Sequence, residues 1–306
     1  MSQPLPQPIL ETRKLGMVYR GDRDVTALHD VSFTLQRGRA LALVGESGSG
    51  KSTCAKLLTR MVTATDGQIL FNGKNVTKPG DRREVLAYRA QVQMVFQDPF
   101  AALNPAHDVR HHLSRPVALH KPELGRGERE DRAVELSLMV GLDPVETLGK
   151  YPHELSGGQR QRVNLARAMA VDPAVLIADE PTSMLDVSIR LNILDMFKPL
   201  KRDRGIAMLY ITHDIATARY VAEETAVIYG GRIVEIGPTS AIIDHPRHPY
   251  TRLLLAAVPE IGRPFGAADA SLVREADRVR AISREPGDLC EVVPGHLVRE
   301  CSAGFD

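Results

Sequence analysis

ALALVGESGSGKS, from Ala40 to Ser52, is the stretch that decides the fold. Its first five residues are apolar without interruption, which predicts a strand buried on both faces of a sheet. Gly45 and Gly50 then form a glycine-rich turn that ends in Lys51 and Ser52, and a helical pattern follows. In such a turn successive backbone N–H groups point at an anion, and the start of the helix adds a favourable field. The stretch therefore predicts a phosphate-binding loop between a buried strand and a helix.

The residues of this loop have expected places around bound ATP and Mg²⁺. We expect Lys51 to reach the β- and γ-phosphates and the hydroxyl of Ser52 to bind Mg²⁺. A glycine turn without a ligand is the alternative, but the strand before it and the helix after it favour nucleotide binding. The residues expected to contact the nucleotide are Gly45, Glu46, Ser47, Gly48, Ser49, Gly50, Lys51, Ser52 and Thr53.

A second apolar run, Val175–Ala178, ends in two adjacent carboxylates, Asp179 and Glu180. Charged groups at the end of a buried strand need a ligand or partner that offsets their desolvation. Beside a phosphate-binding loop, the pair predicts that Asp179 holds Mg²⁺ and that Glu180 is the general base for an attacking water. Two solvated acids at the end of a strand are the alternative.

Further sequence patterns predict strands and helices on both sides of these two segments. Asp66-Gly67 and Asn72-Gly73 enclose a short strand, which predicts a small antiparallel β subdomain, and Gly230-Gly231 predicts a hairpin. Other predicted elements are strands at Val31–Leu35, Val92–Phe96 and Ala207–Ile211, a helix-like middle at about Val109–Val140, and helices at Arg160–Val171 and about Tyr250–Val258. Buried strands separated by helices predict an α/β fold with a mostly parallel sheet covered on both faces.

Composition bounds the class of protein. The 306 residues include 39 Lys and Arg against 38 Asp and Glu, and a net charge of +1 gives no electrostatic footprint for nucleic acid. Apolar runs fall far short of the roughly 20 residues that a membrane-spanning helix needs, and no secretory signal precedes them. The three cysteines, Cys54, Cys290 and Cys301, lack the spacing of a disulfide framework, so we expect reduced thiols and a small packed side chain at Cys54.

Leu155-Ser156-Gly157-Gly158-Gln159 marks a second glycine-rich helix start. Ser156 is expected at or near the N-cap. A second helix N-terminus of this kind is a second anion site, which one nucleotide in the first loop does not obviously need. A capped helix without a ligand is the alternative.

In this order, the elements resemble the ATP-binding cassette (ABC) family over about Ile9 to Pro259. The resemblance implies a P-loop NTPase (RecA-like) mostly parallel sheet, with an antiparallel β subdomain, an inserted helical subdomain at about 98–160 and a small C-terminal extension. The expected ATPase domain is 1–237, and the expected extension is 238–306. The resemblance also implies that Ser156, Gly157, Gly158 and Gln159 close over ATP held by a partner subunit, so that hydrolysis requires a head-to-tail pair.

The same resemblance assigns four more positions. Tyr19 matches the aromatic that stacks on adenine, and Gln97 matches the glutamine that touches Mg²⁺ or water. Asp186, in Ser183-Met184-Leu185-Asp186, matches the loop that communicates across the dimer. His213 matches the histidine that contacts the γ-phosphate and positions the water. The catalytic set is thus Glu180, His213, Gln97 and Lys51, and the metal set is Ser52, Gln97 and Asp179. The other nine histidines, including His111, His112, His245 and His248, are interpreted as surface or turn residues.

Three narrower signals resemble the oligopeptide and dipeptide importer subfamily: FQDPFAALNP from Phe96, YPHE from Tyr151, and HPYT from His248. The resemblance implies a second, paralogous ATPase subunit, two permeases and an extracytoplasmic binding protein, with this chain peripheral on the cytoplasmic face of the membrane. Peptide is the leading cargo, and a cello-oligosaccharide-like solute is a close second. Only Cys290 and Cys301 occupy the region where many members carry an iron–sulfur motif, so we expect no cluster.

Two readings from other classes remain open at this point. A soluble ABC ATPase that acts on DNA or ribosomes would need a coiled-coil insertion or tandem cassettes, and neither is visible in the sequence. A regulatory ATP-binding module without turnover would be unaffected by Glu180→Gln. The sequence does not name the cargo or prove import over export, and it leaves homodimer and heterodimer open.

Overall fold

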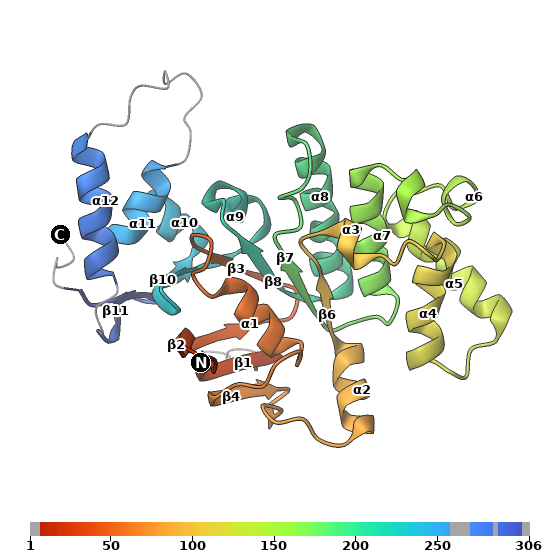
Figure 1. The fold of residues 1–306 in the computed structure, drawn as a ribbon, viewed down its shortest axis with the longest axis horizontal. Helices are drawn as coiled ribbons and strands as arrows, with labels where there is room; N and C mark the ends of the chain where they lie inside the picture. The colour runs from red at the N-terminus through yellow and green to blue at the C-terminus, as the bar shows by residue number, and fades with distance from the viewer. Residues whose placement is uncertain (1–6, 258–269, 284–286, 302–306) are drawn as a thin grey trace, which may run out of the picture.

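The computed structural model describes residues 7–257, 270–283 and 287–301, and its central feature is an eight-stranded mixed sheet (Figure 1). Strands β6, β7, β8, β3 and β9 run parallel in that order, and β10, β12 and β11 continue the sheet in antiparallel fashion. Their bounds are β3 Ala40–Val44, β6 Val92–Val95, β7 Val175–Asp179, β8 Ala207–Thr212, β9 Glu224–Tyr229, β10 Arg232–Pro238, β11 Leu289–Val293 and β12 His296–Arg299. The predicted α/β class is confirmed.

Strand β3 illustrates why the central strands have unbroken apolar sequences. Ala40, Ala42 and Val44 pack into one hydrophobic core, whereas Leu41 and Leu43 pack into another on the opposite face. Successive side chains of a strand point to opposite faces, so a strand covered on both sides must be apolar at every position. The run that the sequence predicted as buried is therefore buried because both faces carry a core.

A second, antiparallel sheet lies beside the first and has the order β2-β1-β4-β5. Its strands are β1 Leu10–Tyr19, β2 Val25–Leu35, β4 Asp66–Phe71 and β5 Lys74–Asn75. Asn72 and Gly73 both have positive φ, 48° and 76°, as the predicted turn requires. Helix α1, Lys51–Leu58, shares one core with both sheets, and Cys54 is fully buried there as a small packed side chain.

A group of helices between β6 and β7 projects from one end of the sheet (Figure 1). The helix-like middle of the sequence is two helices, because Pro122 and Gly125 interrupt it. The elements are α3 Pro99–Ala102, α4 Val109–His120, α5 Arg126–Met139, α6 Pro144–Thr147, η1 Pro152–Glu154 and α7 Gly157–Met169. The remaining helices before residue 222 are α2 Arg82–Gln91, α8 Val187–Arg204 and α9 Ile215–Val221. No helix in the described ranges is both long and apolar enough to cross a bilayer.

The C-terminal region, defined here as residues 239–301, is joined to the main sheet by strands that the sequence analysis did not predict. Strand β12 pairs with β10, with Glu235 opposite Val298. Pro294-Gly295, with a φ of 77° at Gly295, turns β11 into β12 and is the signal that was overlooked. The helices of this region are α10 Thr239–Asp244, α11 Pro249–Ala256 and α12 Ala270–Ile282.

The interpretation of the nine other histidines as surface or turn residues is wrong for His112, in α4, and His296, in β12, whereas His248 lies in the turn before α11 but is buried there. His112, His248 and His296 are 8%, 1% and 2% exposed, respectively. Each is buried because its ring has a hydrogen-bond partner: the Asn104 carbonyl for His112, the backbone N–H of Tyr250 for His248, and the Glu235 carboxylate for His296. A single histidine in a sequence carries no sign of such a partner.

Replacing His248 by asparagine is expected to flatten the pH dependence of stability. Burial lowers the pKa of His248 from its usual value near 6.5 to about 4, with a smaller contribution from Arg299. Between those pH values the unfolded chain binds more protons than the folded one. The free energy of unfolding therefore falls as pH drops from 6.5 towards 4, by up to about 3 kcal/mol. Denaturant unfolding at pH 7 and pH 4.5 measures this difference.

Asparagine still offers an acceptor to the Tyr250 N–H at this helix N-cap but does not titrate. His248→Asn should therefore lose part of the difference between the two pH values. His245→Asn, at an exposed position of the preceding turn, is the matched control and should keep the wild-type difference. An unchanged difference in His248→Asn would contradict the assignment.

Candidate functional site

A cavity of about 710 Å³ opens at the carboxyl ends of the parallel strands, within the size range of small-molecule sites. The glycine-rich loop forms its floor, and the end of β6, the end of β7 and the end of β8 each contribute a polar side chain. The residues that line it are Val25, Thr26, Ala27, Glu46, Ser47, Gly48, Gly50, Lys51, Ser52, Thr53, Gln97, Glu180, His213 and Leu254. Seven of the nine predicted contacts in the glycine-rich loop therefore line one cavity, together with Gln97, Glu180 and His213.

Two glycines of the loop are required by close backbone approach. A Cβ at Gly45 would lie 2.2 Å from the carbonyl oxygen of Ile228, and a Cβ at Gly50 would lie 2.6 Å from that of Ala27. Gly50 also has a φ of 106°, which side-chain-bearing residues rarely adopt. The loop keeps its shape only because these positions carry no side chain.

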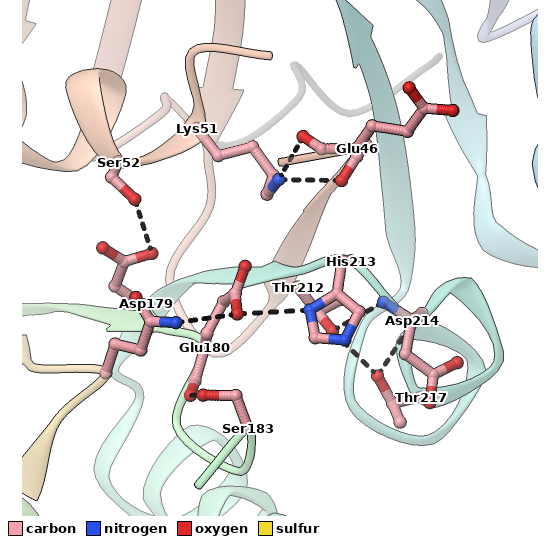
Figure 2. Close-up of polar contacts among 12 residues, drawn as sticks. Glu46, Lys51, Ser52, Asp179, Glu180, Ser183, Thr212, His213, Asp214 and Thr217 are labelled. Carbon is pink, nitrogen blue, oxygen red and sulfur yellow. Dashed lines mark hydrogen bonds and ion pairs between the residues drawn. The ribbon is translucent and has the colours of Figure 1, made fainter. Parts of the chain in front are cut away.

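Lys51 is 4% exposed, and its ammonium group is held by the loop itself (Figure 2). Nζ donates hydrogen bonds to the carbonyl oxygens of Gly45, at 2.7 Å, and Glu46, at 2.8 Å. Both partners are neutral, so they do not offset the positive charge. Burial is the largest influence and lowers the pKa of Lys51, while Glu180, Asp179 and Glu46 act against it. A buried cation of this kind fits an anionic ligand.

Ser49, in the same loop, has a buried hydroxyl group. Its side chain is 4% exposed, and its hydroxyl oxygen is buried without a hydrogen-bond partner. A buried polar group without a partner is destabilising by roughly 1–3 kcal/mol. Ser49 is not among the residues that line the cavity, so this hydroxyl does not itself identify a phosphate contact, and the fit of the loop to a triphosphate rests on the buried ammonium group of Lys51.

Ser52 and Asp179 meet beside the loop, where the Ser52 hydroxyl donates to the Asp179 carboxylate at 3.3 Å. Burial is the largest influence and raises the pKa of Asp179, and the Glu180 charge adds to it against Ser52 and Lys51. A divalent cation would stabilise the charged carboxylate, and a hydroxyl with a carboxylate oxygen is a donor set that suits Mg²⁺. The described residues contain no group of three or more His, Cys, Asp or Glu side chains able to hold a metal alone.

Glu180 is oriented by two side chains that follow the neighbouring strands β6 and β8, and Figure 2 shows one of them, His213, beside it. Gln97 Nε2 donates to its Oε2 at 3.1 Å, and His213 Nδ1 lies 3.2 Å from the same oxygen. Since β6, β7 and β8 are adjacent and parallel, their carboxyl ends bring these three residues to one edge of the sheet. Glu180 also has a φ of 44°, a sparsely populated conformation for a non-glycine residue. Its N–H bonds the Ile211 carbonyl at 2.9 Å.

The helix start at residues 156–159 has the predicted N-cap. The Gln159 N–H donates to the Ser156 hydroxyl at 3.2 Å, and the Ser156 N–H donates to Gln159 Oε1 at 2.9 Å. These reciprocal bonds form a capping box. Neither this segment nor Asp186, which is exposed at the start of α8, is among the residues that line the cavity. One chain therefore does not bring them to its own phosphate loop.

Tyr19 occupies the end of β1, opposite Val25 of β2. Val25 lines the cavity, whereas Tyr19 is not among the lining residues and packs partly against the core shared by the two sheets. The sequence analysis missed the three β2 residues of the lining, and it missed Leu254 of α11. The first residues of a strand and one apolar position in a helix belong to no motif, so nothing in the sequence was a reason to place them at the site.

Comparisons with known proteins agree with this geometry. Residues 28–183 match the model of the family described as ABC transporter, and residues 234–285 match the model described as oligopeptide/dipeptide transporter, C-terminal region. The oligopeptide transport ATP-binding protein OppF of Bacillus subtilis is 39% identical over 305 residues, which are 98% of this chain and 99% of that protein. The glutathione import ATP-binding protein GsiA of Shigella boydii is 45% identical over 96% of this chain, which spans only 49% of GsiA.

Solved structures give the same result for the fold. A dimeric post-hydrolysis ATP-binding cassette, MJ0796 bound to ADP and Pi, superposes with a TM-score of 0.68 at 28% identity, over 75% of this chain and 98% of that one. The protein cbiO1 of Clostridium perfringens, part of the ABC transporter complex cbiONQ, gives a TM-score of 0.69 at 27% identity, over 83% of this chain and 97% of that one.

Proposed function

This chain belongs to the ABC transporter family as an ATP-binding and ATP-hydrolysing importer subunit, and we propose that it powers the uptake of oligopeptides or chemically related solutes. The observation that best supports ATP hydrolysis is the position of the Glu180 carboxylate. Gln97 and His213 orient it in the cavity that the phosphate loop lines. The match of residues 234–285 to an oligopeptide/dipeptide transporter region supports the choice of cargo class.

The catalytic roles follow from the positions of the side chains. The loop N–H groups and Lys51 bind the phosphates, and the Lys51 ammonium neutralises charge on them. Ser52, Asp179 and Gln97 would hold Mg²⁺, which when bound would further neutralise charge on the transferred phosphoryl group. Glu180 accepts a proton from the attacking water, and Gln97 and His213 hold its carboxylate in place. Tyr19, beside Val25, is proposed to lie against the adenine ring.

We propose that the site is completed by a second ABC ATPase subunit packed head to tail. The capped helix start at Ser156, Gly157, Gly158 and Gln159 is a ready anion site, yet it does not line this chain's cavity. It is available to the nucleotide of a partner, as is the exposed Asp186 at the N-cap of α8. Two permease subunits and a solute-binding protein complete the proposed importer, with this chain peripheral to the membrane.

Replacing Ser156 by arginine is expected to separate binding from turnover. The isolated chain should bind ATP with wild-type affinity, because Ser156 does not line its own cavity. ATP turnover by the assembled complex should fall at least about tenfold, since a bulky cation replaces an anion-binding N-cap at the interface. Calorimetric titration of the chain and phosphate release by the complex measure the two effects.

Val145→Arg is the matched control for this experiment. Val145 is 93% exposed on α6, in the same group of helices, and the variant should leave both measurements unchanged. Equal turnover by the Ser156→Arg and wild-type complexes would rule out the head-to-tail arrangement.

The cargo is tested with the reconstituted complex. ATP turnover in proteoliposomes containing the permeases and the binding protein should rise with di- and oligopeptides. Stimulation by cello-oligosaccharides alone would replace the peptide assignment with an oligosaccharide one and leave the motor function intact. Recovery of DNA or ribosomes in place of permeases from a pulldown would exclude a transport role.

A further inference from the structure

Glu46 of the phosphate loop is bound at three of its groups. Its carbonyl oxygen accepts a hydrogen bond from Lys51 Nζ at 2.8 Å. Its backbone N–H donates to the hydroxyl of Tyr250 at 3.1 Å, and its carboxylate pairs with the Arg280 guanidinium at 2.9 Å. Tyr250 and Arg280 are 204 and 234 residues away in sequence. The C-terminal region therefore supplies two of the three contacts that hold this residue.

Tyr250 is held by a rigid network. It is fully buried, and its ring lies 4.4 Å from the ring of Tyr229 of β9, centroid to centroid. The N–H of Tyr250 is capped by His248 Nδ1 at 3.1 Å. The N–H groups of Arg247 and His248 in turn donate to Glu235 of β10, at 2.8 and 3.0 Å. Because β10 and β9 belong to the main sheet, the Tyr250 hydroxyl is fixed relative to the sheet that carries the phosphate loop.

Two helices of the C-terminal region lie beside the nucleotide cavity. Leu254, one turn beyond Tyr250 on α11, lines that cavity. Helix α12, which carries Arg280, packs beside α11 (Figure 1). The region is therefore placed to affect nucleotide binding directly, through Leu254, and through the loop, by way of Glu46.

We propose that Tyr250 and Arg280 are positioning residues that hold the phosphate loop in its nucleotide-binding conformation. This inference rests on the proposed ATPase function. It adds which residues hold the loop in the binding conformation before nucleotide arrives. The loop has glycines at three positions, so its backbone has many alternatives in the absence of restraints. The apparent affinity for nucleotide equals the intrinsic affinity multiplied by the fraction of molecules in which the loop has the binding conformation. The two contacts to Glu46 keep that fraction high, and displacement of the C-terminal region would lower it.

Tyr250→Phe tests the proposal by removing one oxygen atom. The Glu46 N–H loses its partner, and the loop is expected to relax until that group meets water. The affinity of the full-length chain for a non-hydrolysable ATP analogue, AMP-PNP, should fall about tenfold by calorimetry. In the assembled complex the KM for ATP should rise by a similar factor while kcat changes less than about twofold, because Tyr250 touches neither the reacting water nor Glu180.

Tyr88→Phe is the matched control, since it removes another buried tyrosine hydroxyl, which bonds the Leu58 carbonyl at 2.6 Å, and neither Tyr88 nor Leu58 lines the cavity. Both variants should unfold at similar temperatures, and only Tyr250→Phe should bind nucleotide weakly. Equal AMP-PNP affinity in Tyr250→Phe and wild type, or equal losses in both variants, overturns the proposal. Absence of AMP-PNP binding by the wild-type chain would instead overturn the ATPase function itself.

Arg280 provides a second, weaker test through charge. Its pair with Glu46 is partly exposed, with 41% and 38% of the two side chains accessible, so its contribution is small and screened by salt. Arg280→Gln should weaken AMP-PNP binding about twofold to threefold at low ionic strength, and Arg280→Lys should restore most of it. Arg278→Gln, at an exposed position of the same helix, should have no effect. An Arg280→Gln variant that binds as wild type at low ionic strength would remove Arg280 from the proposal.

Discussion

Glu180→Gln is expected to lower ATP turnover by about two to four orders of magnitude while leaving ATP binding intact. The amide has nearly the same shape as the carboxylate, so the backbone at this strained position and its bond to Ile211 are preserved. A neutral amide cannot accept the proton of the attacking water, whereas the proposed phosphate contacts are made by the loop and by Lys51, which the substitution leaves in place. Phosphate release by the assembled complex and ATP titration of the purified chain measure the two quantities.

The experiment also separates an enzyme from a regulatory binding module. Glu84→Gln, at an exposed position of α2, is the control for loss of one carboxylate and should retain wild-type turnover. Wild-type turnover in Glu180→Gln would assign the general base to another residue. Loss of ATP binding would mean that Glu180 acts in binding and not in the chemical step.

Lys51→Ala is expected to weaken ATP binding by about a hundredfold and to lower turnover at least as far. Hydrogen bonds to charged groups contribute roughly 1.5–3 kcal/mol each, and a hundredfold loss corresponds to about 2.7 kcal/mol. The substitution removes the buried ammonium and also frees the carbonyl oxygens of Gly45 and Glu46, so the loop loses an internal restraint as well. Calorimetric titration with ATP and Mg²⁺ gives the change in affinity.

A nearby lysine provides the control. Lys56 lies on the same helix but is exposed, and Lys56→Ala should bind ATP within about twofold of the wild-type affinity. If Lys51→Ala bound and hydrolysed ATP as well as the wild type does, the proposed nucleotide site would be wrong.

The elements that were predicted correctly depend on interactions between residues close in sequence. The strand at Ala40–Val44, the turn at Asn72-Gly73 and the capped helix after Ser156 are each specified within a few residues, by hydrophobic pattern, backbone freedom and capping. The same holds for the phosphate loop, since Lys51 bonds carbonyls five and six positions earlier. Family resemblance then supplied candidates such as Gln97 and His213, which have no local signal.

The elements that were missed depend on partners far away in the chain. Buried His248 and His296 converge on Glu235, and β12 pairs with β10 across an interval of about sixty residues. Nothing in the local sequence of a histidine distinguishes a buried, hydrogen-bonded ring from an exposed one, because the difference lies in the neighbours that folding provides.

The sequence alone determined that this chain has a glycine-rich loop between a buried strand and a helix of an α/β fold, and that another buried strand ends in two carboxylates, since the hydrophobic pattern and backbone freedom of short segments specify these features. Only the tertiary structure decided that Gln97 and His213 share one oxygen of Glu180, that Ser156 is absent from its own chain's cavity, and that Tyr250 and Arg280 hold Glu46. Each of these findings depends on the distance between segments that are far apart in the sequence. Those distances are set by how the strands and helices pack together, and a short stretch of sequence does not specify that packing.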